Sequence, residues 1–306
     1  MTAHPIRNIA ASVHQRLLNR ARKDGRPFGE LLQYYAIERF LYRLSQSHHS
    51  KEFLLKGALM LVAWRAPLSR PTRDIDLLGR IENSIDSVTA AVKDICLQAV
   101  EPDGIVFDPA SIQGERITED ADYPGVRIRF PGRLGQARLT IRIDVGFGDA
   151  VMSSGGEIIY PTLLDYPAPR LAGYSRESLI AEKFEIMVKR GEINSRMKDF
   201  YDIWLLARQF DFRGRMLSKA IEQTFNRRGT ELPVTMDHLM EVLIEDETKE
   251  IQWRSFIRKS RLEVAPKTFT QVIEGIREFL DPILQDLSRK SNPIKIWKAP
   301  GPWASV

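Results

Sequence analysis

The chain has 306 residues, of which 43% are hydrophobic, and 45 lysines and arginines against 40 acidic residues give it a net charge of +5. This length allows two domains and a large core without disulfides or a structural metal. The single cysteine, Cys96, cannot form an intrachain disulfide. No secretory signal follows Met1, and no apolar run approaches membrane-spanning length. We therefore expect a cytoplasmic protein without membrane segments, with mild positive charge that suits a polyanionic partner but does not identify one.

The first 65 residues have mainly helical patterns. Apolar residues recur at helical spacing over residues 6–49, with a break at Gly25-Arg26-Pro27, and this predicts two helices. Residues 52–65 also have a helical pattern, with Gly57 near the start. Pro67 and Pro71 then predict a loop.

Strand patterns begin after that loop. Residues 74–79 (DIDLLG) alternate polar and apolar side chains with period two, which predicts a strand with one wet face and one dry face. An amphipathic helix is expected over residues 84–98. Further short strands are expected over residues 104–107, 125–130 and 137–145. This mixture predicts an α+β domain with a mixed sheet.

From Tyr174 onward the pattern is helical, and we expect no further strand. The helices are predicted at residues 178–189, 195–208, 214–224, 235–245, 247–257 and 268–287. A cluster of prolines and glycine over residues 161–174 marks the boundary. The resulting domains are residues 1–165, with the sheet and the N-terminal helices, a helical domain over 166–290 that completes the cleft, and an irregular tail over 291–306.

Two carboxylates in the first strand predict a metal site. Asp74 and Asp76 lie two residues apart and point to the same face, where like charges repel unless a cation binds between them. Mg²⁺ suits such oxygen ligands. Asp144, which ends the strand over residues 138–143, is the candidate for a third ligand in a two-metal site, with Asp149 as the fallback.

An ordinary solvated strand face is the alternative interpretation of this pair. In that case Arg73 and Arg142 would neutralise the carboxylates. The upstream sequence Lys56-Gly57-Ala58 favours the metal site, because a small-residue turn at a helix start offers backbone N–H groups to a triphosphate.

Four segments, in order, resemble motifs of the AbiEii/AbiGii toxin family, whose members are polymerase-β-like, MenT-like nucleotidyltransferases. Residues 53–59 (FLLKGAL) with 70–79 (RPTRDIDLLG) resemble the first motif, and residues 143–149 (IDVGFGD) resemble the segment with the third acid. Residues 181–185 (AEKFE) and 195–202 (SRMKDFYD) are similar to the two helical motifs. The resemblance implies a polymerase-β-like domain followed by a helical domain.

The resemblance also implies roles for particular residues. Two Mg²⁺ ions would be held by Asp74, Asp76 and Asp144, with an NTP as the substrate. Lys183 and Asp199 would act in catalysis, with Lys183 neutralising triphosphate charge and Asp199 positioning the nucleotide or bracing Lys183. The remaining residues expected to bind the nucleotide are Lys56, Gly57, Ala58, Arg73 and Asp202. An interhelical salt bridge between Lys183 and Asp199, without a catalytic role, is the alternative.

The expected activity is transfer of a nucleoside monophosphate to a hydroxyl acceptor by the toxin of a bacterial toxin–antitoxin or phage-defence system. Some members modify the tRNA 3′ end, so tRNA or another RNA is a candidate acceptor and an AbiEi-like antitoxin a candidate partner. Ala58 departs from the Gly-Gly or Gly-Ser of many relatives, which leaves a catalytically weak nucleotide-binding regulator as one alternative. A protein or small-molecule acceptor is another. The histidines, including His48 and His49, show no metal-ligand spacing, and we expect them on the solvated surface.

Overall fold

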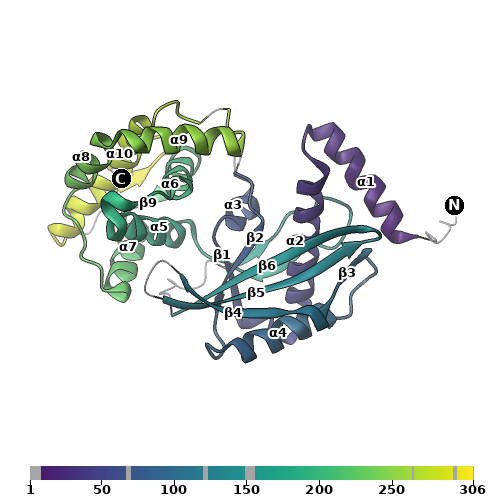
Figure 1. The fold of residues 1–306 in the computed structure, drawn as a ribbon. Coiled ribbons are helices and arrows are strands. Elements are labelled where there is room, and N and C mark those ends of the chain that lie inside the picture. Colours follow the sequence, from purple (N-terminus) through teal and green to yellow (C-terminus); the bar gives the residue numbers. More distant parts are fainter. Residues whose placement is uncertain are drawn as a thin grey trace. The chain divides into compact units, whose positions relative to one another are not determined.

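The structure, a computed structural model, describes residues 8–66, 70–119, 123–148, 156–263, 265–291 and 295–305. These residues group into two units (Figure 1). The described residues of unit 1 fall within Met1–Arg65, Thr72–Gly148 and Gly156–Gly173, and those of unit 2 within Ala66–Pro71 and Tyr174–Val306.

Unit 1 is built on a six-stranded sheet with the path β1-β2-β6-β5-β3, to which β4 is added beside β5. The strands are β1 (Phe53–Lys56), β2 (Asp74–Gly79), β3 (Ile105–Phe107), β4 (Gln113–Glu119), β5 (Tyr123–Leu134) and β6 (Ala137–Phe147). β2 pairs with β6 in parallel, and the other neighbours are antiparallel. The mixed sheet that the sequence predicted is therefore confirmed.

The alternation along β2 and β6 gives the sheet one apolar face. Ile75 and Leu77 are fully or almost fully buried, and their register partners Ile143 and Val145 on β6 are also buried. Because strand side chains alternate between faces, the aspartates at positions 74, 76 and 144 point to the opposite face. Burial of the apolar set fixes this orientation, since a one-residue slip would turn every apolar side chain away from the core.

Two helices, α2 (Phe28–Gln46) and α4 (Ile85–Leu97), cover the apolar face. The Phe40 ring of α2 lies 5.8 Å from that of Phe130 on β5, and a methyl group of Ile85 on α4 lies close to Gly114 on β4. Figure 1 shows α4 running along the sheet beside β4. The remaining helices of unit 1 are α1 (Ile9–Asp24), η1 (His48–Lys51), α3 (Leu59–Ala63) and η2 (Pro109–Ser111).

The helix that we predicted over residues 52–65 is wrong in its first part. Residues Phe53–Lys56 form β1, which pairs with β2, and only Leu59–Ala63 are helical, as α3. The four residues of β1 are all buried, so tertiary packing prevailed over a helical pattern that a short apolar run cannot distinguish from a strand. Three further strands of unit 1 were not predicted, β4, β7 (Glu157–Ile159) and β8 (Arg170–Ala172).

Unit 2 is mainly helical, as predicted. Its helices are α5 (Arg176–Arg190), η3 (Gly191–Ile193), α6 (Met197–Gln209), α7 (Gly214–Arg228), α8 (Asp237–Glu245), α9 (Glu247–Ser260) and α10 (Phe269–Ser288). A capping box at Thr268 and Gln271 starts α10. Its amide and hydroxyl bonds satisfy donors that a helix start otherwise leaves unpaired.

The C-terminal residues correct two expectations, that no strand follows Tyr174 and that the tail is irregular. β10 (Lys295–Trp297) pairs with β11 (Trp303–Ser305) and with β9 (Phe212–Arg213). The Trp297 ring is buried, and its Nε1–H donates to the carbonyl oxygen of Ala207 at 2.6 Å. A buried indole with a satisfied N–H holds this segment against the helices. In the described part of the chain, no helix combines the length and apolarity needed to cross a membrane.

A buried ion pair joins α2 to the segment that enters β3. Asp103 is 2% exposed and accepts two hydrogen bonds from the Arg43 guanidinium, at 2.7 and 3.1 Å. It also accepts from the backbone N–H of Ile105 at 3.0 Å. The bidentate geometry and the third bond compensate for the removal of both charges from water.

We predict that Asp103→Ala lowers the free energy of unfolding by about 3–5 kcal/mol, because it leaves the Arg43 charge buried and uncompensated. Urea denaturation measures this change. Asp165→Ala is the matched control, since Asp165 is fully exposed and pairs with Arg16 at the surface, where a pair contributes about 0–1 kcal/mol. Equal effects of the two substitutions would show that the buried pair does not hold α2 in place.

Candidate active site

Three aspartates converge on one face of neighbouring strands in unit 1. In the parallel register of β2 and β6, Asp76 lies directly opposite Asp144, and Asp74 lies opposite Arg142. Residues in register share a face, and Asp74 and Asp76 share a face because they are two residues apart. The structure therefore brings together the three carboxylates that we predicted as metal ligands. Asp149, the fallback, lies outside the described residues.

Two arginines are bonded to these carboxylates. The Arg127 guanidinium of β5 donates from Nε and Nη2 to the two oxygens of Asp144, at 2.7 and 2.8 Å. The Arg142 guanidinium does the same to Asp74, with 2.6 Å from Nε to Oδ1 and a second, shorter contact from Nη2 to Oδ2. These hydrogen bonds raise the pKa of both arginines. Our alternative interpretation named Arg142, together with Arg73, as a basic partner of the Asp74 and Asp76 carboxylates, and Arg127 was not predicted.

The arginines provide positive charge where like charges are crowded together. Their bidentate geometry uses one lone pair of each carboxylate oxygen and leaves another for a second cation. The side chain of Asp74 is 30% exposed and that of Asp144 is 13% exposed, so neither is fully enclosed by protein.

The turn at Gly57 lies against the carboxylate of Asp76. Gly57 has a φ of +68° and directly precedes Ala58, the residue before α3. A Cβ atom added at Gly57 would lie 2.0 Å from Oδ2 of Asp76. Glycine is therefore required here twice, for a left-handed backbone conformation and for close approach to Asp76.

The other residues predicted to bind the nucleotide near this turn differ in their exposure. Lys56 precedes the turn, is 4% exposed and lies in register with Asp76 on β2. Ala58 is 4% exposed and has a helical conformation. Arg73 lies at an exposed position immediately before β2.

The predicted residues of the helical motifs form a separate buried cluster in unit 2. Lys183 on α5 donates to Oδ1 of Asp199 on α6 at 2.5 Å, and its Nζ lies 2.9 Å from Oδ2 of Asp202. Arg70 donates to both oxygens of Asp202 at 3.0 Å, and Arg196 donates to Asp199 at 2.5 Å. Sequence reasoning missed both arginines as members of this cluster.

Electrostatics within the cluster keep both partners of the central pair ionised. Burial alone would neutralise the Lys183 ammonium, but the carboxylates of Asp199 and Asp202 outweigh it and raise its pKa. Burial likewise favours the neutral acid at Asp199, yet Lys183 and Arg196 lower the pKa of this carboxyl well below its usual range. The interhelical salt bridge of our alternative interpretation is therefore present.

The expectation that all histidines lie on the solvated surface is wrong for His49, which is 9% exposed. His48 and His49 lie beside Asp94 of α4, and the three residues could together hold a metal ion. A pair of adjacent histidines gave no sign of this grouping, because the third residue lies 45 positions further along the chain.

A mixed sheet that carries three carboxylates on one face of neighbouring strands, with a glycine turn against them, is an arrangement of the nucleotidyltransferase class. A family model described as "Nucleotidyl transferase AbiEii toxin, Type IV TA system" matches residues 39–280, which is most of the chain. The chain belongs to this AbiEii family of nucleotidyltransferase toxins, and the resemblance seen in the motifs is confirmed. The family assignment implies an NTP substrate and an antitoxin partner within a type IV toxin–antitoxin system.

Solved structures also resemble this chain. The crystal structure of JHP933 from Helicobacter pylori matches with a TM-score of 0.45 and 13% identity over 86% of this chain and 96% of that chain. A crystal structure from H. pylori that carries a provisional designation as a nucleotidyltransferase has a TM-score of 0.44 and 14% identity, with the same coverage. Similarity at this level does not identify an activity. Comparison with curated proteins gave no match.

Replacement of Gly57 by alanine tests the close approach of the turn to Asp76. We predict that Gly57→Ala lowers the free energy of unfolding through two costs. Alanine costs roughly 1–2 kcal/mol in the left-handed backbone conformation, and the clash of its Cβ with Asp76 adds about 1–3 kcal/mol. Nucleotidyl transfer should fall with it, because Asp76 is displaced. Gly25→Ala is the matched control, since Gly25 has a φ of +63° but no atom within 4 Å of an added Cβ. Identical stability losses would contradict a special contact at Gly57.

We predict that Lys183→Met lowers the free energy of unfolding at neutral pH by about 3–5 kcal/mol, because it leaves buried carboxylates without their ammonium partner. The pair stabilises the fold above about pH 4, the unfolded pKa of Asp199, and below about pH 10, that of Lys183. Stability from Asp199 is lost as pH falls through its lowered folded pKa. The stabilities of the two proteins, measured by urea titration, should therefore begin to converge below about pH 4 and should meet only as pH passes the lowered folded pKa of Asp199. A difference under about 1 kcal/mol at neutral pH would show that the pair contributes little.

Proposed function

We propose that this chain transfers a nucleoside monophosphate from an NTP to a hydroxyl acceptor, with release of pyrophosphate and with two Mg²⁺ ions held by Asp74, Asp76 and Asp144. The observation that carries the proposal is the parallel register of β2 and β6, which sets Asp76 beside Asp144 on the face that Asp74 also occupies.

The residues present fit a pair of hard divalent cations. The three carboxylates provide oxygen ligands, which Mg²⁺ prefers, and two guanidinium groups already lie against Asp74 and Asp144 as cations would. When bound, the ions would activate the acceptor hydroxyl and neutralise charge on the leaving pyrophosphate. We propose that Asp74 and Asp76 contact both ions and that Asp144 contacts the ion next to the acceptor.

The neighbouring residues of unit 1 would position the nucleotide. We propose that the Gly57-Ala58 turn presents backbone N–H groups to the triphosphate, which places phosphate beside Asp76. Because α3 is a helix of five residues, its dipole contributes little and the local amides would provide the binding. Lys56 and Arg73 would add positive charge, Lys56 from β1 and Arg73 from the position before β2.

A second part of the proposal concerns Lys183, Asp199 and Asp202, to which the family motifs assign a role with the nucleotide. The ion pairs of this cluster support a structural role at least as strongly, since the Lys183 ammonium is already engaged by two carboxylates. The two roles make different predictions for Lys183→Arg. The substitution keeps the positive charge. If Lys183 is purely structural, arginine should restore part of the stability and leave the KM for NTP unchanged. If Lys183 contacts the nucleotide in a fixed geometry, arginine should raise the KM for NTP.

We propose the tRNA 3′ end as the acceptor to test first and an AbiEi-like protein as the antitoxin. A structure-selective contact with a tRNA acceptor stem needs backbone recognition more than base readout, which suits a chain with a modest net charge of +5. Incubation with each labelled NTP, Mg²⁺ and total RNA, followed by nuclease or protease digestion, distinguishes the acceptors. Label in RNA supports the proposal, label in polypeptide or in a small molecule supports the other acceptors, and nucleotide binding without transfer supports the regulator.

We predict that Asp76→Asn reduces transfer by roughly 1,000-fold or more, because a lost metal ligand removes several kcal/mol of transition-state stabilisation. The melting temperature should change by only a few degrees, since Asp76 is on the face opposite the apolar core. Initial rates and thermal unfolding measure the two effects. Asp74→Asn and Asp144→Asn should have the same effects as Asp76→Asn.

The control for this series is Asp86→Asn, an exposed aspartate on α4, which should keep wild-type rates. Full activity of Asp76→Asn with an unchanged melting temperature would refute the metal assignment. A loss of activity accompanied by unfolding would instead assign Asp76 to the fold.

A further inference from the structure

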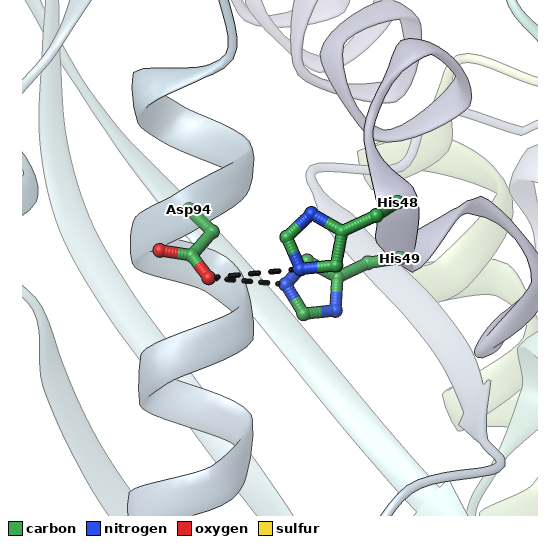
Figure 2. Close-up of side chains that lie close together, drawn as sticks. All are labelled: His48, His49 and Asp94. Atoms are coloured by element: carbon green, nitrogen blue, oxygen red, sulfur yellow. Dashed lines mark hydrogen bonds and ion pairs between the residues drawn. The ribbon is translucent and has the colours of Figure 1, made fainter.

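A second group of potential metal ligands lies on unit 1, on the apolar side of the sheet where α2 and α4 pack. His48 and His49 belong to η1, which follows α2, and Asp94 belongs to α4. Figure 2 shows one carboxylate oxygen of Asp94 facing a ring nitrogen of each histidine. This oxygen lies 3.3 Å from Nε2 of His49 and 3.9 Å from Nε2 of His48.

We propose that His48, His49 and Asp94 bind a single Zn²⁺-like transition-metal ion that links η1 to α4. An ion about 2.0–2.2 Å from each donor in tetrahedral geometry separates its ligand atoms by about 3.3–3.6 Å. One observed separation lies at the edge of this range and the other is slightly longer, so a small rotation of the exposed His48 ring closes the site. The donors of the three residues all lie within 4.8 Å of one another.

The chemistry of the donors selects the kind of ion. Two imidazole nitrogens and one carboxylate suit Zn²⁺ and similar transition metals, whereas Mg²⁺ prefers an all-oxygen set. Three protein ligands leave one tetrahedral position for water. The side chains of His48 and Asp94 are 72% and 53% exposed, so an ion can enter from solvent.

Glu52 supports the site from behind His49. Its Oε2 lies 2.5 Å from Nδ1 of His49, and a carboxylate at this distance requires the proton on Nδ1. Nε2 then faces the Asp94 carboxylate, and the two atoms attract only if a proton or a metal ion lies between them. A carboxylate bonded to the outer nitrogen of a ligating histidine is the usual arrangement around zinc, because it fixes the tautomer and the ring orientation.

The proposed site lies close in sequence to the turn at Gly57 in unit 1. Glu52 immediately precedes β1, and β1 ends at Lys56, next to Gly57. The backbone carbonyl of Glu52 also accepts from the N–H of Arg80 at 2.8 Å, at the end of β2. An ion that links η1 to α4 would therefore hold the start of β1, and its expected effect is on stability rather than on the reacting groups.

The test uses the full-length chain without a histidine tag, treated with chelator and then titrated with Zn²⁺ in excess Mg²⁺. Excess Mg²⁺ competes with Zn²⁺ for the aspartate site proposed on β2 and β6. The substitutions at His48 and Asp94 then test the second site separately, whether or not the aspartate site binds metal. Calorimetry should give one Zn²⁺ per chain, and thermal unfolding should shift upward with Zn²⁺ concentration. Binding should weaken as pH falls, because protons compete for the histidine nitrogens.

Substitutions assign the ligands. His48→Ala and Asp94→Ala change exposed side chains, so both should fold, and each should weaken Zn²⁺ binding by at least about tenfold. Glu52→Ala should weaken it by about 10–100-fold through the loss of support for His49. His238→Ala, an exposed histidine of α8, and Asp86→Asn, on the same helix as Asp94, are the controls and should leave binding unchanged. Stoichiometric binding that survives both His48→Ala and Asp94→Ala, or no binding up to millimolar Zn²⁺, would refute the proposal.

Discussion

The parallel pairing of β2 with β6 is the constraint on which the candidate site depends. It sets Asp76 opposite Asp144, while the two-residue period of β2 places Asp74 on the same face. The register is fixed from the other side of the sheet, where Ile75, Leu77 and their partners are buried under α2 and α4. Hydrophobic burial on one face thus determines the positions of charges on the other, since a slip of one residue would exchange the two sets.

Crowded carboxylates need compensation even without a bound ion. Arg142 lies on β6 and Arg127 on β5, and each lies in register with an aspartate partner, so the sheet that gathers the acids also provides their counter-charges. The bonds are bidentate and partly exposed, which makes them strong enough to orient the carboxylates and open enough to admit a cation. Gly57, in the turn that follows β1, completes the arrangement, because any larger residue there would collide with Asp76.

The ionic cluster of unit 2 depends on different physics. Lys183, Asp199 and Asp202 are almost completely withdrawn from water, and each has more than one partner of opposite charge. Removal of one partner is then far more costly than at the surface. The proposed site at His48, His49 and Asp94 is intermediate in burial. The His49 ring is buried, the other two ligands are exposed, and the Glu52 carboxylate supports His49. The site joins two helical elements through His49 and Asp94, which lie 45 positions apart in the chain.

The sequence by itself determined the fold class, the strand with Asp74 and Asp76, the identity of the third acid as a candidate, and the nucleotidyltransferase family. These features are local: a period-two pattern places two aspartates on one face, and ordered motifs need no knowledge of pairing. Only the tertiary structure decided that Asp144 lies beside Asp76, that Arg127 and Arg142 neutralise the acids, and that residues 53–56 form a strand. It also decided that the C-terminal tail joins a small sheet around Trp297 and that Asp94 meets two histidines. Register, burial and contacts between distant segments set these outcomes, and none of them is encoded in the spacing of neighbouring residues.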